Sequence, residues 1–403
     1  MSLNANIHFS NLPKVDIRRS VFKEPHKLLT SFNFGELIPF FCQECLPGAT
    51  YVRKKDSFLL QMSTPAVSVF DESYCDIFYF FVPTRLVWSH AEHFYARTKE
   101  NDYVPTTEYT IPQLYCDSAE LDSVLDVLYG VRPGVTYSGN ANRPSVSALP
   151  ARAYALIWNE YFRSEELQSS ILIDKSDTAH ARVAKSSGYL SGAQYGGAFC
   201  PVAKYHDYFT SATLRPLRNA SGVPVISDLA PVGAYSDPNT NEPIHFVNTG
   251  TSTNASGALS LSSGYLQGGS TLIVPDNLYA KVTADISALR QAFSLQRMYE
   301  KDELFGGRYT SVLQGHFNVL APDSRLQRPE FIGGSHTAIN VQQILQQSET
   351  ATTPLGYRGA YSVTAKHDRN VFNFTALEHG MIIGVLVLIF SATTQNANNH
   401  SVL

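Results

Sequence analysis

The sequence has little charge. Only 16% of its 403 residues are Asp, Glu, Lys or Arg, whereas soluble domains typically contain about 25%. Lys and Arg number 31 against 35 Asp and Glu, so the chain lacks the positive excess of a protein that condenses nucleic acid. Aromatic residues make up 12%, which excludes a disordered chain. These values favour a β-rich protein with much of its surface hidden from water, and extensive contact between subunits is one way to hide it.

Long hydrophobic runs are also missing. The start of the chain has no apolar core of a secretory signal. The longest apolar stretch, residues 381–390 (MIIGVLVLIF), is too short for a membrane span, which needs about 20 residues. Its β-branched content predicts a buried strand instead. We therefore expect neither a secretory signal nor a membrane span.

The motifs of common enzyme classes are absent. The chain has no G-x-S-x-G elbow, phosphate-binding loop, H-E-x-x-H zinc motif or G-x-G-x-x-G dinucleotide motif. Cys42 and Cys45 form a C-x-x-C pair, but no second pair completes a zinc site, so the five cysteines are expected to be free thiols. His90 and His93 share a helical face without an identifiable third ligand. We predict no enzymatic activity, no metal and no cofactor.

Strand patterns dominate both ends of the chain. Near the N-terminus they cover residues 31–41, 57–62 and 76–82, and the last of these is nearly all apolar, so both of its faces are expected to be covered. Later strands, separated mostly by Gly-, Pro- or Asp-bearing turns, are expected at residues 308–319, 337–346, 357–365, 371–377 and 381–391. Short strands at this spacing indicate a β-sandwich or barrel.

Helical patterns occur as insertions between the strands. They are predicted at residues 84–96, 118–129, 151–167 and 286–304. Ser118 and Asp285 are the expected N-caps of the second and fourth helices, and Gly130 is the expected stop of the second. Nothing alternates strand with helix as a parallel α/β sheet requires. We expect one domain over residues 31–403, preceded by an N-terminal arm at residues 1–30.

Residues 217–275 differ in composition from the rest of the chain. They carry four charged residues and seven glycines among many Ser, Thr, Asn and Pro. A turn-rich segment of this size is usually a functional insertion or a linker. Strand-like pieces at residues 243–247 and 270–274 favour a folded excursion on the surface.

Basic residues cluster in the N-terminal arm. The cluster consists of Lys14, Arg18, Arg19, Lys23 and Lys27. Such a segment can neutralise phosphates while Phe22, which lies among the cations, stacks on an unpaired base. A solvated arm without a ligand explains the same residues at least as well, because five cations do not establish nucleic-acid contact.

Several segments have distinctive sequences. They are FGELIP at 34–39 with CLPG at 45–48, FFVPTRLVW at 80–88, LPARAYALIWNEYFR at 149–163, KYHDYFT at 204–210, LRQAFSLQRMY at 289–299, GGRY at 306–309 and FNVLAPDSRLQRPEFIGG at 317–334. In content and order they resemble the major capsid protein of the gokushovirus branch of the Microviridae, small tailless phages with single-stranded DNA. The resemblance extends over residues 18–384.

The resemblance implies a fold and a function. The expected fold is a viral jelly roll, an eight-stranded antiparallel β-sandwich with long helical and loop insertions. Pentamers would assemble into a T=1 icosahedral shell around circular single-stranded DNA, with residues 217–275 as a surface protrusion that contacts a host receptor. Minor capsid or spike proteins and scaffolding proteins of the same virus would be partners. The protein would be located in the virion after assembly in the host cytoplasm.

Two further groups of residues are candidates for subunit contacts. Those at a strand-to-helix corner are Phe80, Phe81, Pro83, Arg85 and Trp88, and those in a polar loop are Arg325, Arg328 and Glu330. Each group can serve a contact between subunits or packing within one chain, and the sequence does not separate the two roles.

The end of the sequence departs from the family pattern. After EHGMII at 378–383, members of the family continue through further strands, whereas a polar tail at 391–403 follows here. A truncated C-terminal part is therefore expected, and a sheet without its partner strand would expose an unpaired edge. The alternative function is a β-sandwich that binds or hydrolyses carbohydrate, with two carboxylates meeting in a cleft.

Overall fold

The computed structural model describes most of the chain. The described residues are 20–52, 54–61, 72–96, 108–117, 120–131, 143–165, 167–203, 246–248, 260–262, 265–267, 273–275, 286–339, 343–350, 352, 354–361, 363–368 and 370–390. Contacts divide the chain into two compact units. The first comprises Met1–Tyr205 with Pro322–Leu403, and the second comprises His206–Ala321.

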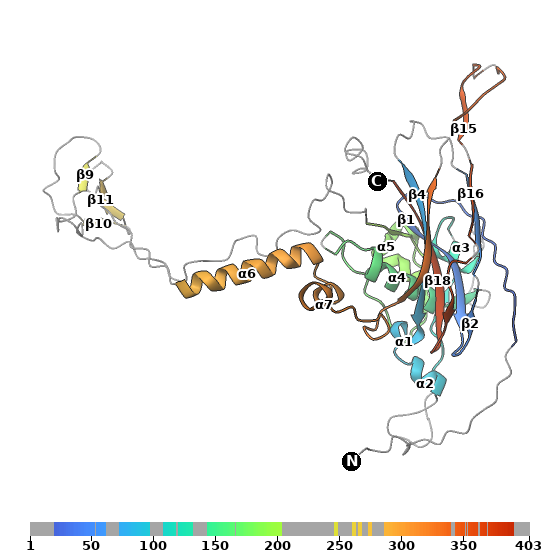
Figure 1. Cartoon of the computed structure of the whole chain (residues 1–403), viewed down its shortest axis with the longest axis horizontal. Coiled ribbons are helices and arrows are strands. Elements are labelled where there is room, and N and C mark those ends of the chain that lie inside the picture. Colours follow the sequence, from blue (N-terminus) through green and yellow to red (C-terminus); the bar gives the residue numbers. More distant parts are fainter. Residues whose placement is uncertain are drawn as a thin grey trace, which may run out of the picture. The chain divides into compact units, whose positions relative to one another are not determined.

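The first unit is built on a five-stranded antiparallel sheet (Figure 1), with the order β13-β4-β18-β1-β8. Its strands are β1 (Glu36–Cys45), β4 (Ser73–Pro83), β8 (Cys200–Pro201), β13 (Glu330–Ile339) and β18 (Gly380–Phe390). The apolar run at residues 381–390 forms β18, as predicted. β18 lies in the middle of the sheet and pairs with β4 from Gly380 to Phe390.

Smaller sheets complete the strands of this unit. They are β16 (Val363–Asp368) with β3 (Asp56–Gln61), β17 (Phe374–Thr375) with β2 (Thr50–Tyr51), β14 (Gln343–Leu345) with β15 (Arg358–Tyr361), and β5 (Gln113–Tyr115) between β6 (Ser145–Ser147) and β7 (His180–Ala181). All of these pairs are antiparallel except β5 with β7. Antiparallel pairing in the five-stranded sheet and in all the two-stranded sheets is compatible with a β-sandwich.

Short helices connect the strands of the first unit. They are α1 (Thr84–Val87), α2 (Ala91–Ala96), α3 (Val124–Tyr129), α4 (Leu149–Ile157) and α5 (Tyr189–Gly192). The prediction that Ser118 caps the second helix is wrong. Ser123 is the cap, because its side chain accepts a hydrogen bond from the Asp126 amide, and Gly130 ends the helix in the left-handed conformation, as predicted.

Two apolar cores lie on opposite faces of the five-stranded sheet. The alternation of side chains along a strand divides β4 between them: Phe80 and Val82 face one core, whereas Tyr79 and Phe81 face the other. The first core contains residues of α3 and α4. Phe58 and Leu60 of β3 pack against the second core. The sheet is therefore covered by helices on one face and by strands on the other.

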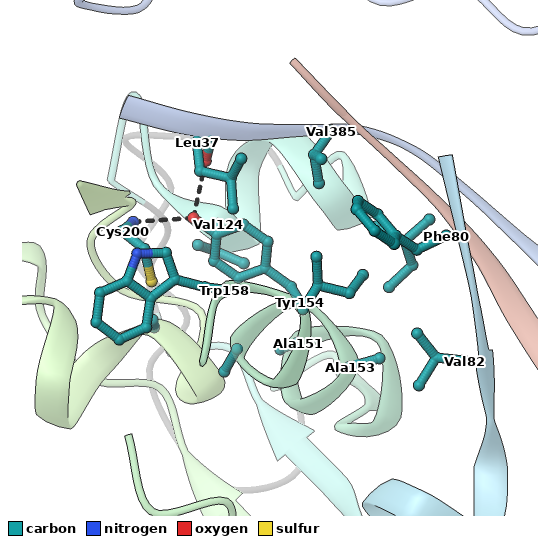
Figure 2. Packing of buried hydrophobic residues seen from close by; sticks show 14 of the residues in the cluster. Leu37, Phe80, Val82, Val124, Ala151, Ala153, Tyr154, Trp158, Cys200 and Val385 are labelled. Carbon is teal, nitrogen blue, oxygen red and sulfur yellow. Dashed lines mark hydrogen bonds between the residues drawn. The ribbon is translucent and has the colours of Figure 1, made fainter. Parts of the chain in front are cut away.

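Helix α4 is anchored in the first core by Tyr154, which is completely buried. Its hydroxyl donates to the Leu37 carbonyl of β1 at 2.8 Å and accepts from the Cys200 amide of β8, also at 2.8 Å (Figure 2). A buried hydroxyl needs such partners, because an unpaired polar group in a core costs free energy. After Ile157 the helix widens into one π-helical turn, Trp158–Phe162, whereas the sequence predicted a regular helix to residue 167.

The second unit contains two helices and four short strands among its described residues. These are α6 (Ile286–Phe305), α7 (Tyr309–Phe317), β9 (Phe246–Asn248), β10 (Ser260–Ser262), β11 (Tyr265–Gln267) and β12 (Ile273–Pro275). The strand predicted at residues 308–319 is wrong, because this segment forms α7. Asn318 ends α7 in the left-handed conformation, and a Cβ at Gly315 would meet the Phe305 ring at 2.6 Å.

The described helices include none that is both long and apolar enough to cross a membrane. Most of the segment 217–275 lies outside the described residues. Its described parts are β10 and β11, which pair with each other, and β12, which pairs with β9.

Candidate subunit-contact and nucleic-acid sites

The strand-to-helix corner is formed where β4 ends at Pro83 and α1 begins at Thr84. Pro83 lies opposite Gly380 of β18, and the Thr84 amide donates to the His379 carbonyl at 3.1 Å. The apolar corner residues Phe80, Phe81, Pro83 and Trp88 are all buried within the first unit. Their side chains are thus part of the folded chain itself.

Trp88 connects the corner to the loop before β7. Its indole nitrogen donates to the Asp177 carboxylate, and the second oxygen of Asp177 lies 2.8 Å from Nδ1 of His90. The His90 ring in turn stacks on Tyr109, with 4.3 Å between the ring centroids. His90 is therefore held by a carboxylate and an aromatic ring. Within the part of the chain that the structure describes, no three His, Cys, Asp or Glu side chains gather as a metal site requires.

Arg85 is the polar residue of the corner. Its Nε donates to Glu378 at 2.7 Å and a terminal nitrogen donates to the same carboxylate at 3.1 Å, so the ion pair is bidentate. Gln327 accepts a further hydrogen bond from Arg85. The hydrogen bond to Glu378 raises the pKa of Arg85, although partial burial opposes this shift. Arg85 thus joins α1 to two segments that are more than 200 residues away in sequence.

Arg328 stabilises the polar loop through an ion pair within that loop. Its Nε donates to Asp323 at 2.7 Å, and its guanidinium lies 4.7 Å from the centre of the Tyr161 ring. The Tyr161 hydroxyl donates to the Pro329 carbonyl at 2.6 Å and lies 3.1 Å from the other oxygen of Asp323. Burial, with the nearby Asp323 carboxylate, raises the pKa of Tyr161, so the hydroxyl stays protonated as a donor. The loop is consequently ordered by contacts within one chain.

Glu330 and Arg325 differ from Arg328 in their surroundings. Glu330 begins β13 and is half-buried; burial, followed by the charges of Asp323 and Glu378, raises the pKa of its carboxyl group. Arg325 is exposed, and its backbone amide donates to the Pro322 carbonyl at 3.1 Å. The structure therefore brings Arg85, Arg328 and Glu330 into one polar cluster and leaves the Arg325 side chain on the surface.

Sequence reasoning missed the carboxylates of this polar cluster. Glu378 and Asp323 hold the two arginines, and neither was a candidate. Glu378 opens the EHGMII segment, whose resemblance to the family was the available signal. The Arg85–Glu378 pair joins residues 293 apart in sequence and depends on how β18 lies beside β4, whereas Asp323 and Arg328 are only five residues apart.

The basic arm is described only in part. Lys14, Arg18 and Arg19 lie outside the described residues, whereas Lys23 and Lys27 are exposed in an extended segment. This segment is fixed to β1 at His26, whose Nε2 lies 2.9 Å from the Phe40 carbonyl. Phe22 is 77% exposed. The two described cations and this aromatic ring are thus accessible to a ligand.

A carbohydrate site would need two carboxylates that meet in a cleft. A pocket of about 720 Å³ lies beside the loop that precedes β7, and Asp174 is the carboxylate in its lining. Asp174 is already bonded to His180 at 2.7 Å and to the buried Arg152 at 3.4 Å. The KYHDYFT segment at 204–210 lies outside the described residues. All five cysteines are free, and four are buried.

The comparisons with known proteins agree with one another. The family model described as capsid protein (F protein) matches residues 10–402. This chain belongs to that capsid protein family. It is 32% identical over 399 residues to the capsid protein VP1 of Bdellovibrio phage phiMH2K, which covers 94% of this chain and 70% of the relative.

Two other relatives carry the same name. The capsid protein VP1 of Spiroplasma virus 4 is 31% identical over 414 residues, covering 98% of this chain and 73% of the relative. The capsid protein VP1 of Chlamydia phage 1 is 29% identical over 449 residues, covering 96% and 74%. The predicted resemblance to Microviridae capsid proteins is confirmed. Membership in this family implies an oligomeric shell and a location in the virion.

Proposed function

We propose that this capsid protein is the structural subunit of a T=1 icosahedral shell that encloses circular single-stranded DNA. The observation that carries the proposal is the strand order of the five-stranded sheet, in a chain that belongs to the capsid family. We further propose that pentamers are the building block and that assembly takes place in the host cytoplasm.

The strand order supports a jelly-roll fold. In an eight-stranded jelly roll, one sheet has the order 1-8-3-6, and strands 2 and 7 are neighbours in the other. Taking β1, β3, β4, β13, β16 and β18 as strands 1, 2, 3, 6, 7 and 8 reproduces the first order as β1-β18-β4-β13. The same assignment pairs strand 2 with strand 7 as β3 with β16. The central position of β18 is that of the last jelly-roll strand.

Assembly of the full-length protein tests the proposed function. Purified protein, examined by sedimentation velocity and negative-stain electron microscopy, is expected to form closed particles of one size. Particles from infected or expressing cells should protect single-stranded DNA from nuclease. Protein that stays monomeric under all assembly conditions, or particles without protected DNA, would contradict the proposal.

The N-terminal arm is proposed to contact the DNA. The accessible Lys23, Lys27 and Phe22 support this role, since cations bind phosphates and an exposed ring stacks on bases. Replacing Arg18, Arg19 and Lys23 with Gln should lower the slope of log affinity against log salt by roughly 2 for a single-stranded oligonucleotide. An unchanged slope and unchanged packaging would contradict the role.

A matched control removes the same number of exposed cations from other parts of the chain. Lys175, Lys301 and Arg325 are exposed, and their replacement with Gln changes the net charge equally. If net charge alone governed binding, this control would lower the slope as much as the arm variant. We expect it to leave the slope close to that of the unmodified protein.

Residues 217–275 are proposed to form the protrusion that contacts the host receptor, because a low-charge, turn-rich surface insertion tolerates change and can carry recognition. Replacing this segment with a short Gly/Ser linker should preserve shell assembly and abolish adsorption to host cells.

Minor capsid or spike proteins and scaffolding proteins are the other proposed partners, and co-purification with particles would detect them. The matching family is one of structural capsid proteins, which disfavours a carbohydrate-binding or hydrolytic function.

A further inference from the structure

Helix α6 carries a stripe of exposed side chains along its whole length. Its members follow at intervals of four, three, four, three and four residues, which keeps them on one face of the helix. The stripe, called the outer stripe below, consists of Ile286, Arg290, Phe293, Arg297, Glu300 and Leu304, all of which are exposed. Its three apolar members are 67%, 61% and 63% exposed, so large apolar groups face outward.

The contact between α6 and α7 uses other side chains of α6. The Asp302 carboxylate lies 2.7 Å from Nε2 of His316 in α7, and Phe305 packs close to Gly315. Ala292, the buried residue of α6, also lies outside the outer stripe. Neither the ion pair nor this packing involves a stripe residue, so the stripe is left for another contact.

The outer stripe is chemically self-complementary about its midpoint. When a second copy of α6 lies antiparallel across it, residues at equal distances on either side of Leu295 face each other. The facing pairs are Ile286 with Leu304, Arg290 with Glu300, and Phe293 with Arg297. These are an apolar pair, an ion pair and a cation–π pair, and each is attractive. Two-fold symmetry makes each pair occur twice.

A parallel arrangement of the same helices lacks this match. In a parallel pair, equivalent positions face each other, so Arg290 would meet Arg290 and Glu300 would meet Glu300. Like charges at contacting positions are repulsive. The pattern of charge therefore selects the antiparallel arrangement and a second copy of this chain as the partner.

We propose that α6 forms a two-fold contact between two copies of this chain through the outer stripe. The proposal deepens the proposed function and rests on it, because a closed shell requires self-complementary contacts between subunits. A helix of 20 residues is about 30 Å long, and packed helix axes lie about 8–10 Å apart. The contact is thus a pair of antiparallel helices that meet along their full length.

Charge reversal tests the ion pair of this contact. Arg290→Glu places two like charges opposite each other, and Glu300→Arg does the same with the other sign. Each single variant is expected to weaken self-association about tenfold at low salt, measured by sedimentation velocity, because the change occurs twice per contact. The double variant restores opposite charges and should regain most of the lost association.

Controls separate this effect from general damage. Gln291→Glu adds a charge at an exposed position outside the outer stripe and should associate like the unmodified protein. Circular dichroism of each variant checks that α6 remains helical. If both single variants associate normally, or the double variant is no better than either, the proposal is wrong.

Disulfide cross-linking tests the geometry without relying on charge. Residues 290 and 300 are about 15 Å apart along one helix, too far for a disulfide within the chain, whose Cα atoms must lie within about 7 Å. In the double variant Arg290→Cys, Glu300→Cys, oxidation should therefore join two chains and give a covalent dimer on a non-reducing gel. The unmodified protein, whose five cysteines are free and mostly buried, sets the background.

A single-cysteine variant tests whether the two helices are antiparallel. In the antiparallel contact, two copies of residue 290 are about 15 Å apart, so Arg290→Cys alone should give no dimer above background. A dimer from this variant, or none from the double variant, would overturn the proposal. Covalent dimers without particles would contradict the proposed shell only. Normal particles from both charge-reversal variants would contradict only the α6 contact.

Discussion

β18 and α6 both carry large apolar side chains, but they place them differently. In β18, Ile382, Ile383 and Val385 are completely buried, because the strand lies in the middle of a sheet with a core on each face. In α6, Ile286 and Phe293 are 67% and 61% exposed. An apolar pattern therefore predicts an element, but it does not predict whether the chain itself covers that element.

The apolar side chains of β18 and those of α6 therefore serve different roles. Burial of the side chains of β18 stabilises the fold of one chain, because their transfer from water is complete before any partner arrives. The exposed face of α6 contributes little to that folding free energy. Substitutions in the two elements should therefore separate stability from association.

The largest expected effect comes from Ile383→Ala in β18. Removing a fully buried side chain leaves a cavity and should lower the free energy of unfolding by about 2–5 kcal/mol. Phe293→Ala in α6 should change it by about 0.5 kcal/mol or less, while weakening self-association. Denaturant unfolding of the unassembled protein measures both. Equal losses of stability in the two variants would remove the distinction between the two elements.

A smaller loss is expected from Gly384→Ala, also in β18. A Cβ at this position would meet Cε1 of Tyr79 at 2.7 Å and Phe40 and Phe41 at 3.0 Å, so the second core is already full there. The overpacking should cost about 1–3 kcal/mol of unfolding free energy. Gly192→Ala is the matched control, because the nearest atom would be 3.5 Å away. If both variants unfold at the same denaturant concentration, the packing around β18 is looser than described.

Tyr154→Phe tests the polar anchor of the first core. The substitution keeps the ring but leaves the Cys200 amide without its acceptor and the Leu37 carbonyl without its donor. We expect a loss of about 1–3 kcal/mol in thermal or denaturant unfolding. Tyr95→Phe, at a 43% exposed ring, should be nearly neutral. A neutral Tyr154→Phe would show that water replaces the lost hydroxyl.

The smallest effect is expected from Glu120→Gln on the loop before α3. The Lys185 amide, which donates to Glu120 at 2.6 Å, lowers the pKa of this carboxyl group. A lowered folded-state pKa stabilises the fold above the unfolded value of about 4.3 and loses this contribution as the pH falls below it. Glu120→Gln should therefore flatten the acid side of the stability profile slightly. An unchanged profile would contradict the pairing.

Local patterns predicted some elements well and failed for others. β4 and β18 were expected from their apolar runs, and α6 ends one residue beyond the predicted helix. The segment 308–319 was predicted as a strand, yet its residues Tyr309–Phe317 fold as α7. Propensity is a weak prior that packing overrides, and here Gly315 allows α7 to approach Phe305 closely.

The candidate sites were predicted as residue types rather than as contacts. The sequence indicated Arg85, Arg328 and Glu330, but Glu378, which holds Arg85, and Tyr161, which stacks under Arg328, come from distant parts of the chain. Asp323 lies only five residues from Arg328 and was still missed. A charged side chain far from its partner in sequence carries no local sign of that partner. Trp88 and Pro83 were candidates for a subunit contact, and the folded chain buries both.

The sequence by itself determined which segments of the chain are apolar. Low charge and a high aromatic content indicated a β-rich protein with much surface hidden from water, and the apolar runs indicated its strands. Only the tertiary structure decided which apolar segments are covered within one chain. Coverage depends on which strands flank β18 and on where α7 packs against α6, and these are long-range contacts that no local pattern specifies.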